Sequence, residues 1–228
     1  MRLQQVTGPV IEPMTLTEAK LALRVDTAFT ADDSYIGDLI SSAREYIEQS
    51  SHRKLITQTW DLFLDCLIGT NSNAAGWSSA LTGYYGTGGA AGNTIYNNAY
   101  KHNVLVLPHS PVQSVTWFKY YDTGGYLQTW DSANYIANPG SPGRVAPLQS
   151  IAFPSVASQI DCINIRYVAG FGDAESNVPY IAKQLIYLMV NHYYFNRLPV
   201  VTGTISSEIA MTVDDGISLL GIGANLFA

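Results

Sequence analysis

The sequence is short of charged residues, and its few basic residues are not gathered together. Charged side chains make up 13% of the 228 residues, about half of the ~25% that is usual in soluble domains. The 12 Lys and Arg residues are outnumbered by 18 Asp and Glu residues, which gives a net charge of −6. A DNA-binding domain normally carries the opposite sign, with its basic residues on one face. The composition therefore argues against a protein that holds nucleic acid by charge.

Cysteine and long apolar runs are also scarce. The only cysteines are Cys66 and Cys162, and they have no metal-ligand spacing with each other or with the four histidines. A disulfide between them stays open, although two buried thiols in a protein made in the cytosol fit the sequence better. No stretch of about 20 apolar residues predicts a membrane span, and the first residues lack the apolar core of a signal peptide. We expect no cofactor, no metal and no membrane partner.

Catalytic signatures are missing as well. Residues 86–91 have the spacing of a dinucleotide-binding loop, but that motif works between a strand and a helix, and here it lies in a polar segment. Paired carboxylates could indicate a glycosidase, for which the candidates are Asp61, Asp65, Asp122, Asp131 and Asp161. Each aspartate has a simpler explanation on the polar side of a strand or at a turn. We predict that the protein is not an enzyme.

Three segments have the 3.6-residue apolar period of helices. The first begins at Thr15, which forms the pattern of a capping box with Glu18. The second follows a weaker version of that pattern at Thr30, and its polar residues are assigned to the solvent side: Asp38, Ser41, Arg44, Glu45 and Glu48. The third, residues 179–196, is apolar over most of its circumference, which predicts burial on several sides.

Between the second and third helices the apolar period changes to two, as in strands. Strands are predicted from residue 58 and at 103–107, 113–121, 125–130 and 160–168, with shorter ones near 135 and 145. A Gly-, Asn- and Ser-rich segment at 69–103 is interpreted as a surface insertion. The predicted fold class is α+β: a small helical bundle of two N-terminal helices plus one C-terminal helix, with an inserted antiparallel β region and an extended C-terminal arm.

The predicted boundaries follow these changes of pattern. Residues 1–57 contain an N-terminal arm and the helical pair, and residues 58–172 contain the β region with its insertion at 69–103. Residues 173–198 form the helix that completes the bundle, and residues 199–228 form the C-terminal arm.

Three groups of apolar or aromatic residues are candidate contact sites, because aromatic residues are enriched and charges depleted where chains meet. The first group lies in the insertion: Trp77, Tyr84, Tyr85, Tyr96 and Tyr100. The second lies in the arm: Ile217, Leu219, Leu220, Ile222, Leu226 and Phe227. The third is one side of the third helix, which we expect a neighbouring subunit to cover: Ile186, Val190, Tyr193 and Tyr194.

Short motifs in residues 9–65 occur in a distinctive order. They are LTEAK at 16–20, LRVD at 23–26, AREYIE at 43–48 and RKLITQTW at 53–60. Together they resemble the start of the tailed-phage head–tail connector, or adaptor, proteins. The likeness continues through GRVAP at 143–147, IRYVAGFG at 165–172 and HYY at 192–194. The resemblance implies a structural protein without chemistry.

The resemblance further implies a closed ring of about twelve copies in the virion neck, assembled in the cytoplasm of the bacterial host. Such a ring contacts itself, the portal protein, and the next neck or tail protein, a stopper or tail terminator. Genomic DNA would pass through its lumen without sequence-specific binding. The apolar residues of the C-terminal arm, which has too little periodicity for a core of its own, predict that the arm docks on the portal. The alternative is that the arm folds back onto its own subunit or an adjacent one. Two alternatives stay open: another phage neck or tail-completion protein, and a carbohydrate-binding module of a fibre.

Overall fold

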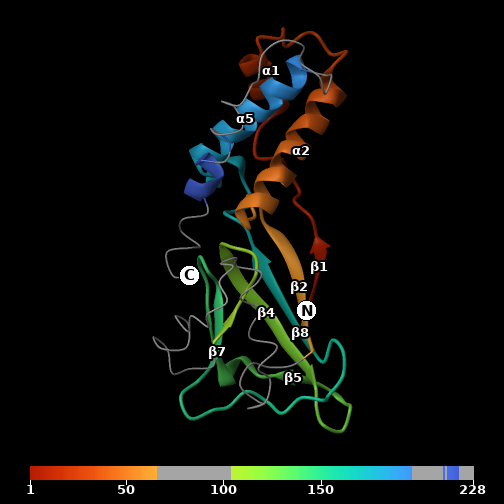
Figure 1. Ribbon diagram of the computed structural model, residues 1–228, viewed down its shortest axis with the longest axis vertical. Helices are drawn as coiled ribbons and strands as arrows, with labels where there is room; N and C mark the ends of the chain where they lie inside the picture. The colour runs from red at the N-terminus through yellow and green to blue at the C-terminus, as the bar shows by residue number, and fades with distance from the viewer. Residues whose placement is uncertain (66–103, 197–212, 214, 221–228) are drawn as a thin grey trace, which may run out of the picture.

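The computed structural model describes residues 1–65, 104–196, 213 and 215–220. These residues form an elongated molecule with helices at one end and sheets at the other (Figure 1). The chain passes between the two halves three times, after β1, after α2 and after β8. The predicted α+β fold class is confirmed.

Three helices form the bundle: α1 (Leu16–Leu23), α2 (Asp33–Ser51) and α5 (Tyr180–Phe195). Each packs against the other two. Their apolar faces share one core with residues 213 and 215–220, which are also helical. The largest fully buried side chains of this core are Met14, Ile36, Ile47, Leu55, Ile56 and Ile186.

Local chemistry sets the start of α1 as the sequence predicts. The amide of Glu18 donates to Thr15 Oγ1 at 3.1 Å, and the amide of Thr15 donates to Glu18 Oε2 at 2.9 Å, which completes the capping box. The corresponding prediction for α2 is wrong. That helix begins after Asp32 without a side-chain cap, and only the backbone carbonyl of Thr30 accepts a hydrogen bond, from the amide of Asp33.

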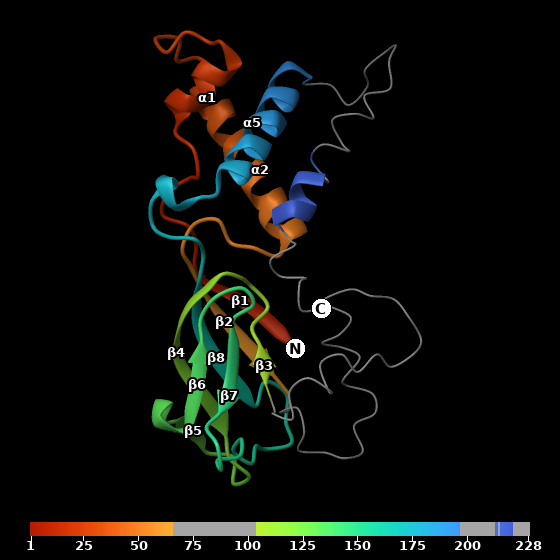
Figure 2. The same ribbon diagram turned by 90° about the vertical axis from the view of Figure 1, so that its left-hand side faces the viewer.

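The β half consists of two antiparallel sheets that lie face to face (Figure 2). The larger has the order β1 (Arg2–Thr7), β2 (Gln58–Leu64), β8 (Ile163–Ala169), β4 (Val112–Tyr121) and β5 (Leu127–Trp130). The smaller has the order β3 (Leu105–Val106), β7 (Arg144–Pro147) and β6 (Tyr135–Asn138). Two short 3-10 helices, η1 (Ser132–Asn134) and η2 (Glu175–Asn177), lie in the connections.

The core of the β half lies between the two sheets. Alternate residues of β2 and β8 point into it, and Leu62, Ile165 and Tyr167 are at most 1% exposed. An aromatic group closes it on the side of β5, where the ring centroids of Phe118 and Trp130 are 5.0 Å apart. The apolar residues that alternate in the sequence of β2 and β8 are therefore the ones that point into the core between the sheets.

Besides the two 3-10 helices, one strand and one helical segment were not predicted. The expected N-terminal arm contains β1, an edge strand of the larger sheet. The expected irregular arm contains the helical residues 213 and 215–220. The five aromatic residues of the predicted insertion contact lie outside the described residues. Within the described ranges, no helix is both long and apolar enough to cross a membrane.

Candidate assembly surfaces and the junction between the two halves

Asp61, one of the candidate catalytic carboxylates, forms a cross-strand ion pair. It lies on β2 opposite Arg166 of β8. Both of its oxygens accept hydrogen bonds of 2.7 Å from that guanidinium, and the bond and the negative charge raise the pKa of Arg166. Asp61 is only 6% exposed, whereas its predicted place was the open polar side of a strand. Its role is to join two strands.

Asp65 and Asp161 serve the end of the same sheet. Asp65 Oδ1 accepts a hydrogen bond of 2.9 Å from the amide of Asp161. Asp161 Oδ2 accepts from Arg2 of β1, with Nη2 at 2.7 Å and Nε at 3.1 Å. These bonds tie the loop before β8 to the strands beside it.

Asp122 organises a turn and Asp131 follows the end of β5, both as the sequence predicts. Asp122 Oδ1 accepts hydrogen bonds from the amides of Tyr126 and Gly124. The bond from Tyr126 contributes most to lowering the pKa of Asp122. Asp131 Oδ1 accepts a 2.9 Å bond from the amide of Ala133 and so begins η1. Among the described residues, no group of three or more His, Cys, Asp or Glu side chains could hold a metal ion.

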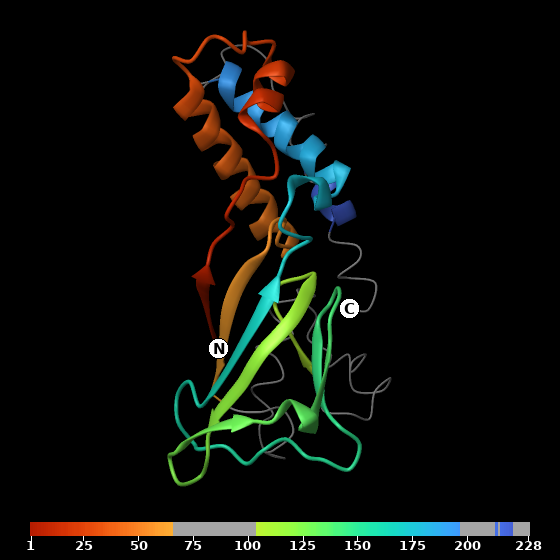
Figure 3. The same cartoon turned by 180° about the vertical axis from the view of Figure 1, so that it is seen from behind.

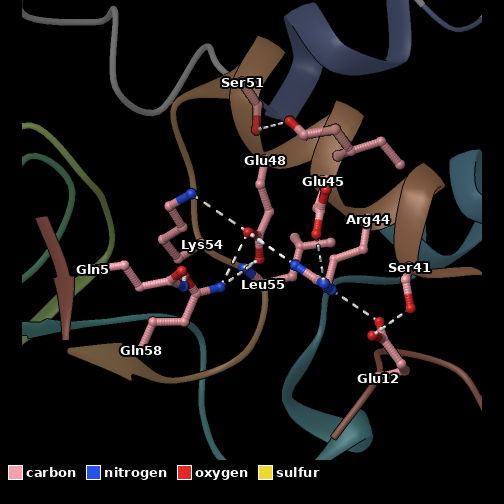
Figure 4. A network of polar contacts seen from close by, with 11 residues as sticks. Gln5, Glu12, Ser41, Arg44, Glu45, Glu48, Ser51, Lys54, Leu55 and Gln58 are labelled. Carbon is pink, nitrogen blue, oxygen red and sulfur yellow. Dashed lines mark hydrogen bonds and ion pairs between the residues drawn. The ribbon is translucent and has the colours of Figure 1, made fainter. Parts of the chain in front are cut away.

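The strongest polar cluster lies where α2 meets β2 (Figure 4). Glu48, 3% exposed, accepts hydrogen bonds from the amide of Leu55 at 2.9 Å and from Gln58 Nε2 at 3.0 Å. Two cations flank it, with Lys54 Nζ at 3.4 Å and Arg44 Nη1 at 3.5 Å. Burial lowers the pKa of Lys54, and the carboxylate of Glu48 offsets part of this effect.

This cluster extends to two further segments. Arg44 Nε donates to Glu12 Oε2 at 2.8 Å, and Ser41 Oγ donates to Glu12 Oε1 at 2.9 Å. On the other side, Gln5 Nε2 of β1 donates to Gln58 Oε1 at 2.9 Å. The junction network, defined as these residues with Glu48, Lys54 and Leu55, therefore joins α2, β1, β2 and the segment before α1.

The prediction that Arg44 and Glu48 face solvent is wrong. They are 7% and 3% exposed. The apolar period of α2 identifies one buried stripe, but its last turns are also covered by the segments that enter the sheets (Figure 4). From the sequence alone, charged residues such as Arg44 and Glu48 are assigned to the solvent side, because the strand that covers them is not yet known.

His109 is also buried. It is 7% exposed, and its ring centroid lies 4.4 Å from that of Trp60. Burial lowers the pKa of His109 to about 3, and the nearby positive charge of Lys54 acts in the same direction. His109 therefore belongs to the neutral packing beside the junction network.

The predicted subunit contact on α5 needs correction. Ile186 and Val190 are 0% and 1% exposed and lie in the bundle's own core. Tyr194 is partly buried and donates a 2.6 Å hydrogen bond to Asp32 Oδ2. Of the four predicted residues, only Tyr193, 42% exposed, faces outward. The other three side chains are buried or partly buried within the subunit, because α5 packs against both α1 and α2.

The exposed side of α5 forms a shallow groove with α1 that the sequence analysis missed. Tyr180 is 90% exposed, Leu21 is 65% exposed and Leu188 is 37% exposed. The lining residues of this α1–α5 groove are Glu18, Leu21, Ala22, Tyr180, Ile181, Lys183, Gln184, Tyr187, Leu188 and Asn191. The helical period contains this signal, because positions 180, 184, 187, 188 and 191 share one face, which differs from the face of Ile186 and Val190.

The structure places some residues of the predicted portal contact in the core and leaves others exposed. Ile217 and Leu220 are 8% and 5% exposed and lie in the bundle's own core, so their side chains are not available to contact the portal. Leu219 is 59% exposed and keeps its place in the prediction. Ile222, Leu226 and Phe227 lie outside the described residues.

The described surface is more acidic than the net charge suggests. Four of the ten described basic residues are buried, namely Lys20, Arg44, Arg53 and Lys54. Only two of the described acidic residues, Glu48 and Asp61, are buried. A larger share of the described cations than of the described carboxylates is therefore buried.

Comparison with known proteins gives one sequence family and a set of similar structures. Residues 13–78 match the family described as "Phage gp6-like head-tail connector protein". This match contains α1, α2 and β2, and it confirms the resemblance drawn from the motifs of residues 9–65. No curated protein matches the chain.

Three similar solved structures are chains of gene transfer agent (GTA) particles. One belongs to the "Neck of empty GTA particle computed with C6 symmetry", with a TM-score of 0.67, 20% identity and 95% of each chain covered. One belongs to the "Virion of native gene transfer agent (GTA) particle", with a TM-score of 0.66, 18% identity and 94% of each chain covered. A third belongs to the "Neck of native GTA particle computed with C12 symmetry", with a TM-score of 0.57, 19% identity, and 95% and 94% covered. The fold is therefore shared along nearly the whole chain.

Proposed function

We propose that this protein is a structural head–tail connector in the neck of a tailed phage or phage-like particle. The observation that carries the proposal is the family match of residues 13–78. The likeness of the whole fold to chains from particle necks supports it. The roles of the five candidate aspartates agree with a protein that performs no catalysis, since each of them holds a strand, a loop or a turn.

The working form is a closed ring of about twelve copies. The sixfold and twelvefold symmetry named for the similar necks supports a cyclic arrangement. Identical copies in a ring meet through two different surfaces, one on each side of the subunit. The α1–α5 groove is one of these surfaces, because it exposes Tyr180, Leu21 and Leu188 on an otherwise acidic bundle.

The ring lies between the portal protein and the next neck or tail protein. Leu219 and the residues that follow it contact the portal, and Tyr193 contacts a neighbouring copy. Genomic DNA passes through the lumen. A wall with exposed carboxylates repels phosphates, so the strand slides past it without being held.

Imaging of the neck in intact particles tests this function. We expect a cyclic ring of this chain between the portal and the tail, with density that fits both halves of the subunit. Finding the chain on a fibre, or in no part of the neck, would remove the proposal. Locating it one ring further down would favour the alternative of a tail-completion protein.

A further inference from the structure

The outer face of the larger sheet carries an ordered row of cations and aromatic rings. Arg2 Cζ lies 3.9 Å from the centroid of the Phe63 ring. Arg166 Cζ lies 4.0 Å from the Trp117 ring, and Lys119 Nζ lies 4.4 Å from the same ring. These five residues, on β1, β2, β8 and β4, are called the cation–aromatic face.

This face lies on the outer side of the larger sheet in the part of the chain that the structure describes. It points away from the smaller sheet, and no described helix or strand lies on that side (Figures 1 and 3). The side chain of Arg2 is 51% exposed and that of Arg166 is 25% exposed. The inward neighbours Leu62 and Ile165 are 1% and 0% exposed. The side chains on the outer face of the sheet are therefore much more exposed than those on the inner face.

The charges on this face are only partly balanced. Arg2 is paired with Asp161, and Arg166 is paired with Asp61. Within the described ranges, no ion pair joins Lys119 to a carboxylate. The face therefore presents one surplus positive charge on a scaffold that is already ordered.

The chemistry favours a protein surface over nucleic acid. Bases bind single-strand platforms by stacking on open aromatic rings, but here Arg2, Arg166 and Lys119 cover the rings of Phe63 and Trp117. The carboxylates beside both guanidiniums would also repel phosphates. Arginine and tryptophan held together in this way are typical of protein–protein contacts, where they contribute most of the binding energy.

The α1–α5 groove has the complementary composition. Two tyrosines, Tyr180 and Tyr187, line it together with the carboxylate of Glu18. Glu175 also lies close enough to Tyr187 for its charge to act on the phenol. Glu175 lies beside the groove and not in its lining, where Glu18 is matched by one cation, Lys183, so the groove and its margin together carry two carboxylates and one cation. The groove is thus acidic and aromatic where the sheet face is cationic and aromatic.

Building on the ring of the proposed function, we propose that the cation–aromatic face of one copy docks in the α1–α5 groove of the next copy. Lys119 then meets Glu18 or Glu175 across the contact. One surface belongs to the β half and the other to the bundle, at opposite ends of an elongated molecule (Figure 1), so one copy cannot satisfy both by itself. A contact between two unlike surfaces propagates from copy to copy, and it closes when the rotation allows a ring.

Zero-length cross-linking tests the pairing directly. A carbodiimide joins an amine only to a carboxylate that touches it, and a mixture of ¹⁴N- and ¹⁵N-labelled copies separates links between copies from links within one. We expect isotopically mixed peptides that join Lys119 to Glu18 or Glu175. Lys119→Arg is the matched control, since it keeps the charge but removes the amine. It should lose the link and keep the association. Links of Lys119 that occur only within one copy, or only to other carboxylates, overturn the pairing.

Charge reversal gives a second measurement on folded protein. We expect Lys119→Glu and Glu175→Lys each to weaken self-association about tenfold in mass photometry, and the double variant to recover part of the loss. Leu188→Asp, in the groove, should weaken it as well. If Leu188→Asp weakens self-association and Lys119→Glu does not, the result supports a contact at the groove and contradicts its pairing with the cation–aromatic face. If wild-type copies do not associate, the pairing falls, while the connector assignment still rests on neck imaging. An effect of Lys119→Glu on duplex DNA retention in place of self-association would overturn the pairing and mark the face as a DNA contact.

Discussion

At the residue scale, several of the few charged side chains are buried and form hydrogen bonds and ion pairs that hold the subunit together. Lys20, 3% exposed, shows the principle: its ammonium donates to the carbonyls of Thr27 and Phe29 and forms an ion pair with Asp33. It thereby fixes the loop between α1 and α2. Pattern analysis cannot find such residues, because a buried lysine and a solvated one look alike in a sequence. The aspartates at turns were predictable, since their partners are two to four residues away.

Glu48→Gln should lower the free energy of unfolding by about 3 kcal/mol. The substitution keeps the shape but leaves the buried Lys54 without the carboxylate that it contacts, and it removes one of the carboxylates beside Arg44. Breaking one partner of a buried ion pair is costly. Urea denaturation measures the change. Glu45→Gln is the control, because the Glu45 side chain is 69% exposed, and it should change stability by no more than about 0.5 kcal/mol. Equal effects of the two variants would contradict the buried role of Glu48.

Asp61→Asn should cost about 1–2 kcal/mol of stability, since it removes charge-assisted hydrogen bonds to Arg166. A double-mutant cycle with Arg166→Gln isolates the pair from other effects. The coupling energy should account for most of the loss. A coupling energy near zero would return Asp61 to the category of an ordinary polar strand residue, as the sequence first indicated.

His109 should make the protein less stable in acid. Its pKa is about 3 in the folded state and about 6.5 in the unfolded chain, so below pH 6.5 unfolding takes up a proton. Stability should therefore fall between pH 6.5 and pH 3, by at most ~1.4 kcal/mol per pH unit from this group. Urea unfolding at pH 7, 5.5 and 4.5 should show a smaller loss in His109→Asn than in the wild type. Parallel curves for the two proteins would contradict a neutral, buried histidine.

At the element scale, the sequence predicted what local pattern can encode. The capping box at Thr15, the stripe of α2 and the alternation of β2 and β8 all depend on residues close to one another. The strand β1 was missed because only Leu3 of its six residues is even partly buried, so the strand has no apolar alternation. The helical residues 215–220 were missed because the segment is short and contains Gly216, and because its position depends on a core built by distant helices.

The C-terminal helical residues provide a matched pair of substitutions. Ile217→Ala should cost about 2–4 kcal/mol, because it opens space in the bundle core. Leu219→Ala should change stability by no more than about 0.5 kcal/mol, since its side chain is 59% exposed. Thermal or urea unfolding separates the two, and particle yield then tests whether Leu219 serves the portal. A destabilised Leu219→Ala would mean that both residues belong to the core.

At the scale of the whole molecule, the sequence indicated that surfaces matter but not which ones. An apolar helix such as α5 predicts burial on several sides, and only the fold shows that Ile186 and Val190 face the subunit's own core while Tyr180 and Leu188 remain outside. The cation–aromatic face is assembled from four strands that are far apart in the sequence. No local pattern could have placed Arg2 beside Phe63 or Arg166 beside Trp117.

The distribution of charge predicts weak interaction with DNA. Because the buried set removes four cations from the surface but only two carboxylates, the purified protein should not retain duplex DNA at 150 mM salt. Gel-shift measurements over a range of salt concentrations check this. Retention that falls steeply with salt would show phosphate contacts, and would contradict a lumen that lets DNA slide.

The junction network also has a mechanical meaning. Its bonds cross from α2 and the segment before α1 to β1 and β2, so the bundle and the sheets are clamped at the point where an elongated body would otherwise bend. A force applied to one end is then carried to the other as a rigid lever carries a load. A displacement of the helical end should therefore move the sheet end of the same subunit with it.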